Sequence, residues 1–447
     1  MSLLHTMAPA AETAVGAKAE EVVLHLLVQL IVILIATRIV VAVVKKFGQT
    51  DVAGEILAGL LLGPSFLGAL APDAMAHLFD ASTSKIFVGL AQLGLVLLMF
   101  QIGLEFEFKT NLNTSKRSVA VVSVMGMVVP FALGYATSLW FYDHLPEPRP
   151  SVLGFRLFFG IAMSITAIPV LGRIFMELGL SHTRTAALTI GAAAIDDVVG
   201  WLLLGIVTLV VQERFAAGSF LVRVAALLVY LGFLFFVLRP ILKRTLIAHV
   251  AKHGGLTLQT IAYVLILLLV SATTTSLLGV FAVIGGFTLG AALHDERDFV
   301  NAWKQRVSPL VTTLFLPIFF AYTGLRTDVR GLATAADWGV CLLVIAVAFV
   351  SKFGGAYLGA RLVGEGSRSA LAVGICMNTR ALMELIAINV GYDLGVLPRS
   401  MFTMLVLMAI ASTYITTPII RILLRGQERT SEGLLAPPAA APERSAA

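Results

Sequence analysis

The stretch LTIGAAAIDDVVGWLLLGIVTLV, from Leu188 to Val210, places two adjacent carboxylates, Asp196 and Asp197, inside a run of apolar residues. A run of this length can cross a lipid bilayer as a helix. A charge at the centre of such a helix costs roughly 2.5–3.5 kcal/mol on insertion scales. Two carboxylates kept side by side in this position therefore indicate a functional site inside the membrane.

The whole sequence of 447 residues has the composition of a membrane protein. Hydrophobic residues make up 58% of it and charged residues 13%, with a mean hydropathy of +0.93, whereas a soluble domain carries about 25% charged residues. Apolar stretches recur along most of the chain, which predicts an all-α polytopic membrane protein with about 13 transmembrane helices. The expected spans lie near 21–44, 52–70, 85–103, 117–140, 152–173, 185–211, 219–242, 256–276, 278–293, 308–325, 335–360, 369–392 and 400–424.

The basic residues are distributed unequally between the two sides of the predicted membrane segments. The loops on the side of Lys45 and Lys46, together with the C-terminal tail, hold 20 Lys and Arg residues, and the opposite side holds 9. The positive-inside rule then places the N-terminus outside and the C-terminus in the cytoplasm of a cell inner membrane or plasma membrane. The net charge of +6 is thus a topology signal, and no nucleic-acid partner is expected.

The two ends of the chain differ from the apolar region between them. Residues 1–20 are expected to be an extracytoplasmic segment without the features of a cleavable signal peptide. Residues 21–425 form the predicted transmembrane domain, and the Pro/Ala-rich residues 426–447 form a disordered cytoplasmic tail, too short for a regulatory nucleotide-binding domain. Cys341 and Cys376 both fall inside apolar segments, which favours neither a disulfide nor a cysteine metal site.

Two pairs of segments repeat each other in the same order. GEILAGLLLGP (54–64) matches FAVIGGFTLGA (281–291), and FQIGLEFE (100–107) matches FAYTGLRTD (320–328). The match aligns Gly59 with Gly286, Gly63 with Gly290, and Gly103 with Gly324. Short Gly/Leu strings also recur by chance, but a true match makes spans 2–6 repeat as spans 9–13 in opposite orientation. Inverted repeats are typical of secondary transporters and predict discontinuous helices at spans 5 and 12.

Both of these spans contain polar or helix-breaking residues. In span 5 the helix breaker is Pro169, preceded by Ser164 and Thr166, whose hydroxyls can satisfy freed backbone groups. An ordinary proline kink is the alternative. The centre of span 12 is too polar for lipid contact, since it holds Asn378, Thr379, Arg380 and Glu384. Arg380 and Glu384 are four residues apart and can pair on one helix face, as a structural ion pair or with a direct role in transport.

The two aspartates cannot face the same partner, because successive side chains on a helix point about 100° apart. We therefore expect one carboxylate to meet a fixed counter-charge and the other to face a water-filled cavity. The counter-charge available is Lys352, which lies in mid-span between 335 and 360, too far from either end to reach water. A hydrated carboxylate of this kind can exchange H⁺ for a small cation. A purely structural Asp–Lys pair is the alternative.

Five motifs together resemble those of a known family. They are GEILAGLLLGP, SITAIPVLGRI, AAAIDDVVGW, SKFGGAYLGAR and MNTRALMELIAINVGYDLGVL. In this order, over roughly residues 20–425, the sequence resembles the monovalent cation:proton antiporters of the sodium/hydrogen exchanger superfamily, in the bacterial branch related to Kef-type and plant cation/proton exchangers. Kef-type proteins carry a nucleotide-binding domain and a glutamine-containing span 12 motif, and these differences argue against Kef-like gating.

The resemblance implies a specific assignment of roles. It implies a homodimer of thirteen-helix subunits, each with a scaffold (21–70 and 219–293) and a moving core (85–211 and 308–424) containing two crossed, partly unwound helices. Asp197 would carry the cation and protons, Asp196 would pair with Lys352, and Thr166 with nearby carbonyls would help to coordinate the ion. The Asp-Asp pair with an intramembrane lysine is similar to the electrogenic type. No cofactor is implied beyond the transported Na⁺, or alternatively K⁺ or Li⁺, and H⁺.

Three other functions fit the composition less well. A sodium-coupled organic-anion symporter on a related inverted-repeat fold would need a larger polar cavity, for which the sequence gives no sign. An intramembrane aspartyl protease needs two carboxylates that converge from separate helices, whereas Asp196 and Asp197 diverge from one. A channel would require a selectivity-filter loop, and none is recognisable. The sequence therefore predicts an antiporter and not an enzyme.

Overall fold

The computed structural model describes residues 4–49, 51–79, 81–104, 116–145, 147–166, 183–212, 217–247, 255–278, 281–380 and 382–424, with 171, 175 and 180. Regular secondary structure in these residues is entirely helical. This follows from the apolar composition, because a helix satisfies its own backbone polar groups where no water is available. Within the described part of the chain, ten helices are long and apolar enough to cross a membrane, and three shorter apolar helices accompany them.

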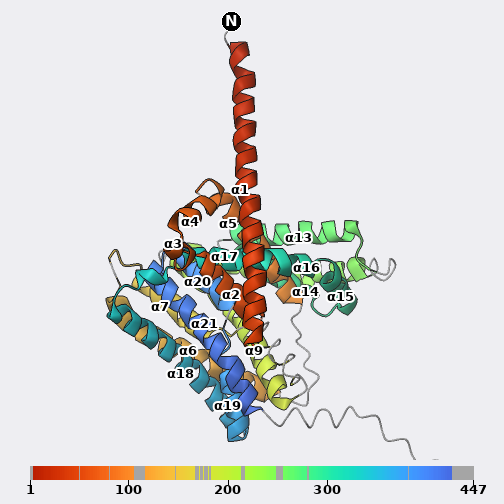
Figure 1. Ribbon diagram of the computed structural model, residues 1–447. Coiled ribbons are helices and arrows are strands. Elements are labelled where there is room, and N and C mark those ends of the chain that lie inside the picture. The colour runs from red at the N-terminus through yellow and green to blue at the C-terminus, as the bar shows by residue number, and fades with distance from the viewer. Residues whose placement is uncertain are drawn as a thin grey trace, which may run out of the picture.

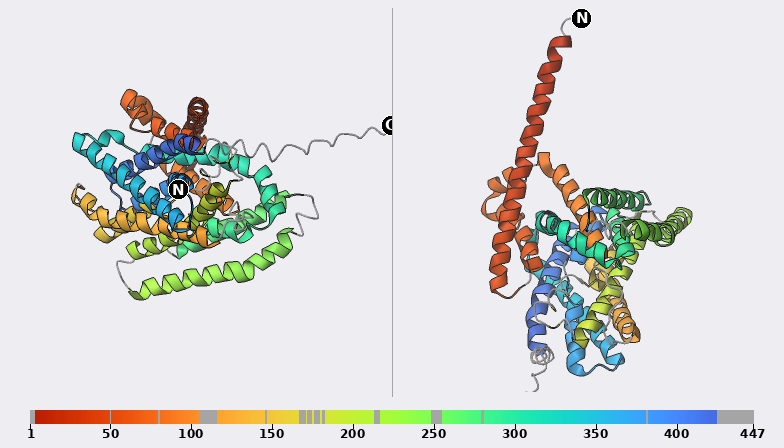
Figure 2. Two further views of the ribbon diagram at one scale, coloured as in Figure 1. Left: turned by 90° about the horizontal axis from the view of Figure 1, so that it is seen from below. Right: turned by 90° about the vertical axis from the view of Figure 1, so that its right-hand side faces the viewer.

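The first half of the described chain contains two groups of helices. The first group is α1 (Leu4–Lys46), α2 (Asp51–Leu62), α3 (Leu67–Leu70), α4 (Pro72–Leu78) and α5 (Ala81–Leu104). The second is α6 (Lys116–Asp143), α7 (Val152–Ser164), α9 (Arg184–Gln212) and α10 (Ala217–Phe233), which continues through η1 (Leu234–Leu238), α11 (Arg239–Leu242) and η2 (Lys243–Ile247). The N-terminal part of α1 projects beyond all the other helices, and the segment from α10 to η2 lies along the outside (Figures 1 and 2).

The second half supplies the remaining helices. They are α13 (Leu258–Leu277), α14 (Ala282–Leu293), α15 (Arg297–Arg306), α16 (Ser308–Leu310), η3 (Val311–Phe315), α17 (Leu316–Arg326), η4 (Val329–Gly331), α18 (Ala335–Leu362), α19 (Ser367–Met377), α20 (Leu382–Asp393) and α21 (Arg399–Leu423). The expected spans 5, 9 and 12 contain the three shorter apolar helices, Val152–Ser164, Ala282–Leu293 and Ser367–Met377. The multi-span helical fold is confirmed, and α1 begins well before the expected residue 21.

Two helix crossings are made by the glycines that the sequence repeat aligns. Where α2 crosses α17, a Cβ atom on Gly324 would lie 1.9 Å from the carbonyl oxygen of Gly59. Where α5 crosses α14, a Cβ atom on Gly290 would lie 2.1 Å from the carbonyl oxygen of Phe100 and 3.0 Å from Cα of Gly103. Only glycine permits backbones to approach this closely. Each crossing joins one helix from the first copy of the sequence repeat to one helix from the second copy.

The packing separates two groups of helices. In one group, α6 packs against α7, α9 and α18, while α19 and α21 pack against α18 and each other; α6 and α18 lie side by side in Figure 1. In the other group, α1 packs on α2, α2 on α17, and α5 on α14. Helices α5 and α17 make their glycine crossings with α14 and α2. The division into core and scaffold that the family resemblance implies stays a prediction.

Candidate functional site

Helix α7 ends at Ser164, in the middle of an apolar span, and leaves carbonyl groups that need partners. The next residue, Ile165, is extended, with φ −74° and ψ 144°. Within the last turn, the carbonyl of Ile161 accepts from the hydroxyl of Ser164 at 2.9 Å and from the amide of Ile165 at 3.2 Å. The expected helix breaker Pro169 lies outside the described residues. Helix α7 therefore ends inside the expected span 5, five residues before Pro169.

Two buried cations satisfy the carbonyl groups at the end of α7. Arg380 donates from Nη1 to Ala162 at 2.5 Å and from Nη2 to Met163 at 2.7 Å. Lys352 donates from Nζ to the carbonyl oxygen of Ser164 at 2.5 Å. A helix C-terminus carries partial negative charge, so positive side chains are favourable there. The end of α7 is therefore held by one residue from the α19–α20 segment and one from α18.

The second interruption lies between α19 and α20. Helix α19 ends at Met377 and α20 begins at Leu382. The hydroxyl of Thr166 lies 3.2 Å from the carbonyl oxygen of Met377, which connects this interruption to the one after α7. Thr379 donates to the carbonyl of Cys376 at 2.7 Å. Two unwound segments therefore meet in the protein interior, where discontinuous helices are tolerated because protein surrounds them.

Arg380 and Glu384 form a second buried ion pair beside these segments. Arg380 Nη1 lies 3.0 Å from Glu384 Oε1, and neither side chain is exposed. Arg380 also donates to the carbonyl of Ala348 on α18 at 3.3 Å, and Thr413 on α21 donates to the carbonyl of Arg380. This guanidinium reaches α7 and α18 simultaneously. Its contacts are those of a residue that fixes the interrupted helices in place.

Asp196 is held by three side chains from three different segments. Its Oδ2 lies 3.0 Å from Lys352 Nζ, and neither residue is exposed. Ser123 on α6 donates to Oδ1 at 2.7 Å, and Thr166 donates to Oδ2 at 3.1 Å. Lys352 in turn donates to the carbonyl of Gly126 at 2.7 Å. The ion pair expected between Asp196 and Lys352 is present, and hydrogen bonds satisfy both of its members.

Asp197 has the opposite environment. Its side chain is completely buried, and among the described residues neither carboxylate oxygen has a hydrogen-bond partner. The amide of Asn378 is likewise buried, and neither of its polar atoms has a hydrogen-bond partner among the described residues. The hydroxyl of Thr166 contacts Asp196 and the carbonyl of Met377. Asp197 and Asn378 are the next residues in the chain after these two contacts. A buried carboxylate without a donor is costly unless it holds a proton or a cation.

The geometry adds two residues to the set that the sequence indicates. Ser123 and the carbonyl of Gly126, both on α6, contact Asp196 and Lys352 respectively. A serine three residues before a glycine in an apolar helix is not a distinctive pattern, so neither residue could be selected from the sequence. Thr166, expected near the transported ion, contacts Asp196 and not Asp197. Its position lies between the two interrupted helices.

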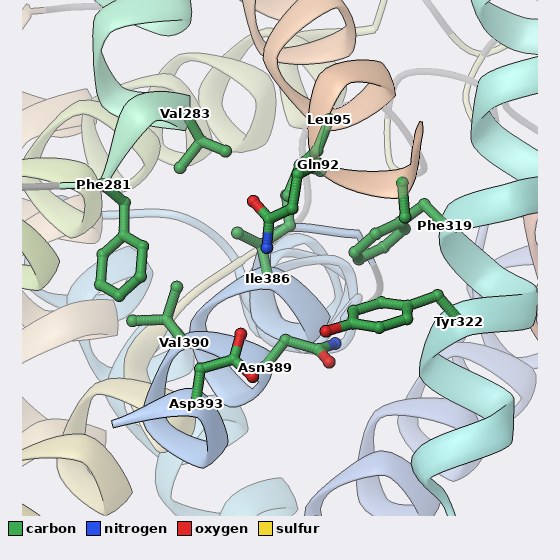
Figure 3. A pocket seen from close by; sticks show the side chains of 11 residues that line it. Gln92, Leu95, Phe281, Val283, Phe319, Tyr322, Ile386, Asn389, Val390 and Asp393 are labelled. Atoms are coloured by element: carbon green, nitrogen blue, oxygen red, sulfur yellow. The ribbon is translucent and has the colours of Figure 1, made fainter. Parts of the chain in front are cut away.

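A small cavity lies between helices α5, α14 and α17 of one group and helix α20, which packs on α7 and α21 of the other. It holds about 20 Å³, which is room for a single water molecule. Figure 3 shows Gln92 of α5, Tyr322 of α17, and Asn389 and Asp393 of α20 pointing toward it. Arg326, one turn beyond Tyr322, pairs with Asp393 at 2.6 Å and lies 4.1 Å from the centre of the Tyr322 ring. A charged contact therefore joins α17 to α20 at this boundary.

Residues 30–426 match the family model described as "Sodium/hydrogen exchanger, transmembrane". The chain belongs to the sodium/hydrogen exchanger family. Members of this exchanger family are monovalent cation/proton antiporters, so the protein is a transporter that carries out antiport and not an enzyme. The membership that the five sequence motifs predicted is confirmed, and with it the multi-pass membrane location.

Individual relatives agree with membership of the exchanger family. The chain is 36% identical over 398 residues to the Na(+)/H(+) antiporter NhaS4 of Synechocystis, covering 89% of this chain and 96% of that protein. It is 34% identical to Cation/H(+) antiporter 17 of Arabidopsis thaliana, covering 88% of this chain and 48% of that protein. The chain thus spans about half the length of this plant relative.

Solved structures support the same fold. The sodium proton antiporter MjNhaP1 from Methanocaldococcus jannaschii aligns with a TM-score of 0.59 at 17% identity, covering 91% of this chain and 99% of that one. At this identity the likeness concerns the fold alone. The overall helical fold is therefore shared with a solved sodium proton antiporter.

Proposed function

We propose that this antiporter exchanges Na⁺ for protons, with K⁺ and Li⁺ as alternative cations, and that Asp197 is the group that carries them. The observation that carries the proposal is the contrast between two adjacent carboxylates. Asp196 receives three donors, while both oxygens of the buried Asp197 have none among the described residues. A carboxylate in that position is satisfied by either a proton or a cation, and competition between the two is exchange.

The surroundings of Asp197 supply oxygen ligands for a small hard cation. Such cations prefer carboxylate, amide and backbone oxygens. The unpartnered amide of Asn378 and the non-helical backbone at Ile165 and Thr166 offer groups of this kind. Entry of the cation displaces the proton from Asp197, and release of the cation on the other side allows a proton to return. Thr166 positions the site by tying Asp196 to Met377.

The Asp196–Lys352 pair determines how many protons are exchanged for each cation. When the cation recruits Asp196 as a further ligand, Lys352 loses its carboxylate partner and can release a second proton. Two protons then move against one monovalent cation, so each cycle carries net charge and the antiport is electrogenic. Ser123 and Thr166 keep Asp196 within reach of both states.

The architectural part of the proposal concerns movement. The core would comprise α6, α7, α9 and α18 to α21, moving like an elevator against a scaffold of α1, α2, α5, α13, α14 and α17. The matched crossings at Gly59–Gly324 and Gly103–Gly290 support two inverted repeats within thirteen membrane crossings. We further propose a homodimer within the bilayer, with the N-terminus outside and residues 426–447 in the cytoplasm.

Proteoliposomes containing a pH-sensitive dye test this function. Addition of Na⁺ to one side of the wild-type protein should dissipate a preset pH gradient, with no organic anion present. Asp197→Asn should abolish the Na⁺-driven proton flux, because an amide cannot exchange a proton for a cation. Asp295→Asn is the matched control, since Asp295 pairs with Arg239 and Lys243 near the protein surface, and it should keep wild-type flux.

Two outcomes would contradict the proposal. Full exchange in Asp197→Asn excludes this carboxylate as the carrier. A proton flux that appears only after an organic anion is supplied favours the sodium-coupled symporter instead. The same vesicles, clamped with a potassium ionophore, measure whether a membrane potential drives proton movement, as electrogenic exchange requires. Parallel additions of Na⁺, K⁺ and Li⁺ rank the cations.

A further inference from the structure

Two histidines that take no part in the proposed transport site lie against each other on separate helices. His25 is on α1 and His77 is on α4, and their ring centroids are 5.5 Å apart with an interplanar angle of 70°. His25 is half-buried and His77 is exposed, so both rings lie at the protein surface, near the first residues of the candidate span Glu20–Lys46. Neither residue belongs to the helices that carry Asp196, Asp197 or Lys352.

The hydrogen bond made by His25 leaves its second nitrogen available. Nδ1 of His25 lies 3.0 Å from the carbonyl oxygen of Glu21. A carbonyl oxygen can only accept, so Nδ1 carries the hydrogen, and in the neutral imidazole Nε2 then keeps its lone pair. Histidines that bind metals have this arrangement, in which one ring nitrogen donates to a backbone carbonyl and the other faces the ion.

A buried glutamine fixes the two helices relative to one another. Gln29, one turn after His25 and 1% exposed, donates from Nε2 to the carbonyl of Leu78 at 2.7 Å and to the hydroxyl of Thr83 at 2.6 Å. Leu78 directly follows His77. The end of α4 is therefore attached to α1 one turn away from the two imidazoles, and the pair is held in place by the protein itself.

The separation of the two rings suits a shared metal ion. Imidazole nitrogens bind Zn²⁺ at about 2.0–2.1 Å, so two rings at a tetrahedral angle have centroids about 5 Å apart. The observed 5.5 Å is close to this value. Carboxylates one turn before each histidine, Glu21 on α1 and Asp73 on α4, add negative charge near the pair. Both the geometry and the charge favour a divalent cation.

We propose that His25 and His77 form a binding site for a divalent transition-metal cation of the Zn²⁺ type, which joins α1 to α4. Imidazole is a preferred ligand of Zn²⁺, Cu²⁺ and Ni²⁺. Among the described residues there is no cluster of three or more metal-ligating side chains, so water completes the coordination and the affinity is modest. Bound metal stabilises the folded protein by mass action, because the unfolded chain does not hold the two imidazoles together.

The test uses Zn²⁺ and the full chain, purified in detergent through an affinity tag that contains no histidine. Isothermal titration and thermal unfolding are measured for the wild type, His25→Ala, His77→Ala and the control His144→Ala. His144 is a good match because its Nδ1 also lies 2.7 Å from the carbonyl four residues earlier, but its ring packs on Trp140 instead of a second histidine. All three histidines have surface access, so folding should be retained.

We expect the wild type and His144→Ala to bind one Zn²⁺ per chain and to unfold at a higher temperature when Zn²⁺ is present. His25→Ala and His77→Ala should each lower the affinity at least tenfold and lose the rise in unfolding temperature. Cu²⁺ bound to the wild type should show two nitrogen ligands by electron paramagnetic resonance. Absence of wild-type binding, unchanged affinity in both alanine variants, or a single nitrogen ligand would each overturn the proposal.

Discussion

At the scale of single residues, Lys352 connects three segments through one ammonium group. It donates to Asp196 on α9, to the carbonyl of Ser164 at the end of α7, and to the carbonyl of Gly126 on α6. An ammonium has three hydrogens, and each of these contacts uses one of them. No donor capacity is left over, so any change at this position leaves buried acceptors without partners.

We predict that Lys352→Ala is strongly destabilising as well as inactive. Removing one member of a buried ion pair typically costs about 3–5 kcal/mol, because the remaining charge stays buried. The unfolding temperature in detergent should therefore fall markedly, whereas Lys85→Ala, at an exposed lysine on α5, should leave it unchanged. Equal unfolding temperatures for the two variants would contradict the contacts assigned to Lys352. Asp196→Asn combined with Lys352→Met should recover part of the lost stability.

The same residues show how far the sequence could predict the site. A charge in a membrane helix needs a partner, and Lys352 was the only lysine in mid-span, so the Asp196–Lys352 pair was predictable. The contacts of Ser123 and the carbonyl groups that Arg380 binds were not predictable, because these contacts depend on how each helix is rotated against its neighbours. Serine and threonine are also common in apolar helices, where they usually bond to their own backbone, as Ser164 does.

At the scale of elements, the two glycine crossings determine how close the scaffold helices lie. We predict that Gly324→Ala is destabilising and poorly assembled, since its Cβ would overlap the Gly59 carbonyl, which belongs to a helix backbone and cannot move aside. Gly354→Ala on α18 is the control, because no atom lies within 4 Å of its added Cβ. Detergent-solubilised yield and unfolding temperature should drop for Gly324→Ala only. Wild-type behaviour of Gly324→Ala would refute the close crossing.

The elements themselves were largely predictable from hydrophobic length, and the two interruptions from their polar residues. The partners of α5 and α17 were not predictable. The glycines that decide their packing make contact with α14 and α2, which lie far away in the chain. Those glycines are recognisable in the sequence as a repeat. A repeat predicts that two segments have equivalent structures, but it does not predict which segments contact each other.

At the scale of the whole molecule, the Arg326–Asp393 contact joins the two groups of helices that we propose move relative to each other. We predict that Asp393→Asn loosens this boundary. A hydrogen bond to a charged group contributes about 1.5–3 kcal/mol, so amide hydrogen exchange should accelerate at least tenfold at the end of α17 and in α20. In Asp393→Asn, amide exchange in α6 and α18 should stay unchanged. In the control variant Asp295→Asn, amide exchange in α17 and α20 should also stay unchanged. Uniform acceleration across the protein would instead indicate general destabilisation.

The distance along the chain between Asp196 and Lys352 has a consequence for biogenesis. The ribosome adds about 5–20 residues per second, and 156 residues separate the two, so the aspartate is made roughly 8–30 seconds before its lysine. During that interval the nascent α9 enters the translocon without the ammonium that later neutralises it. Ser123 is already synthesised by then and can shelter the carboxylate early. Synthesis of α18 is therefore the earliest point at which the buried ion pair between Asp196 and Lys352 can form.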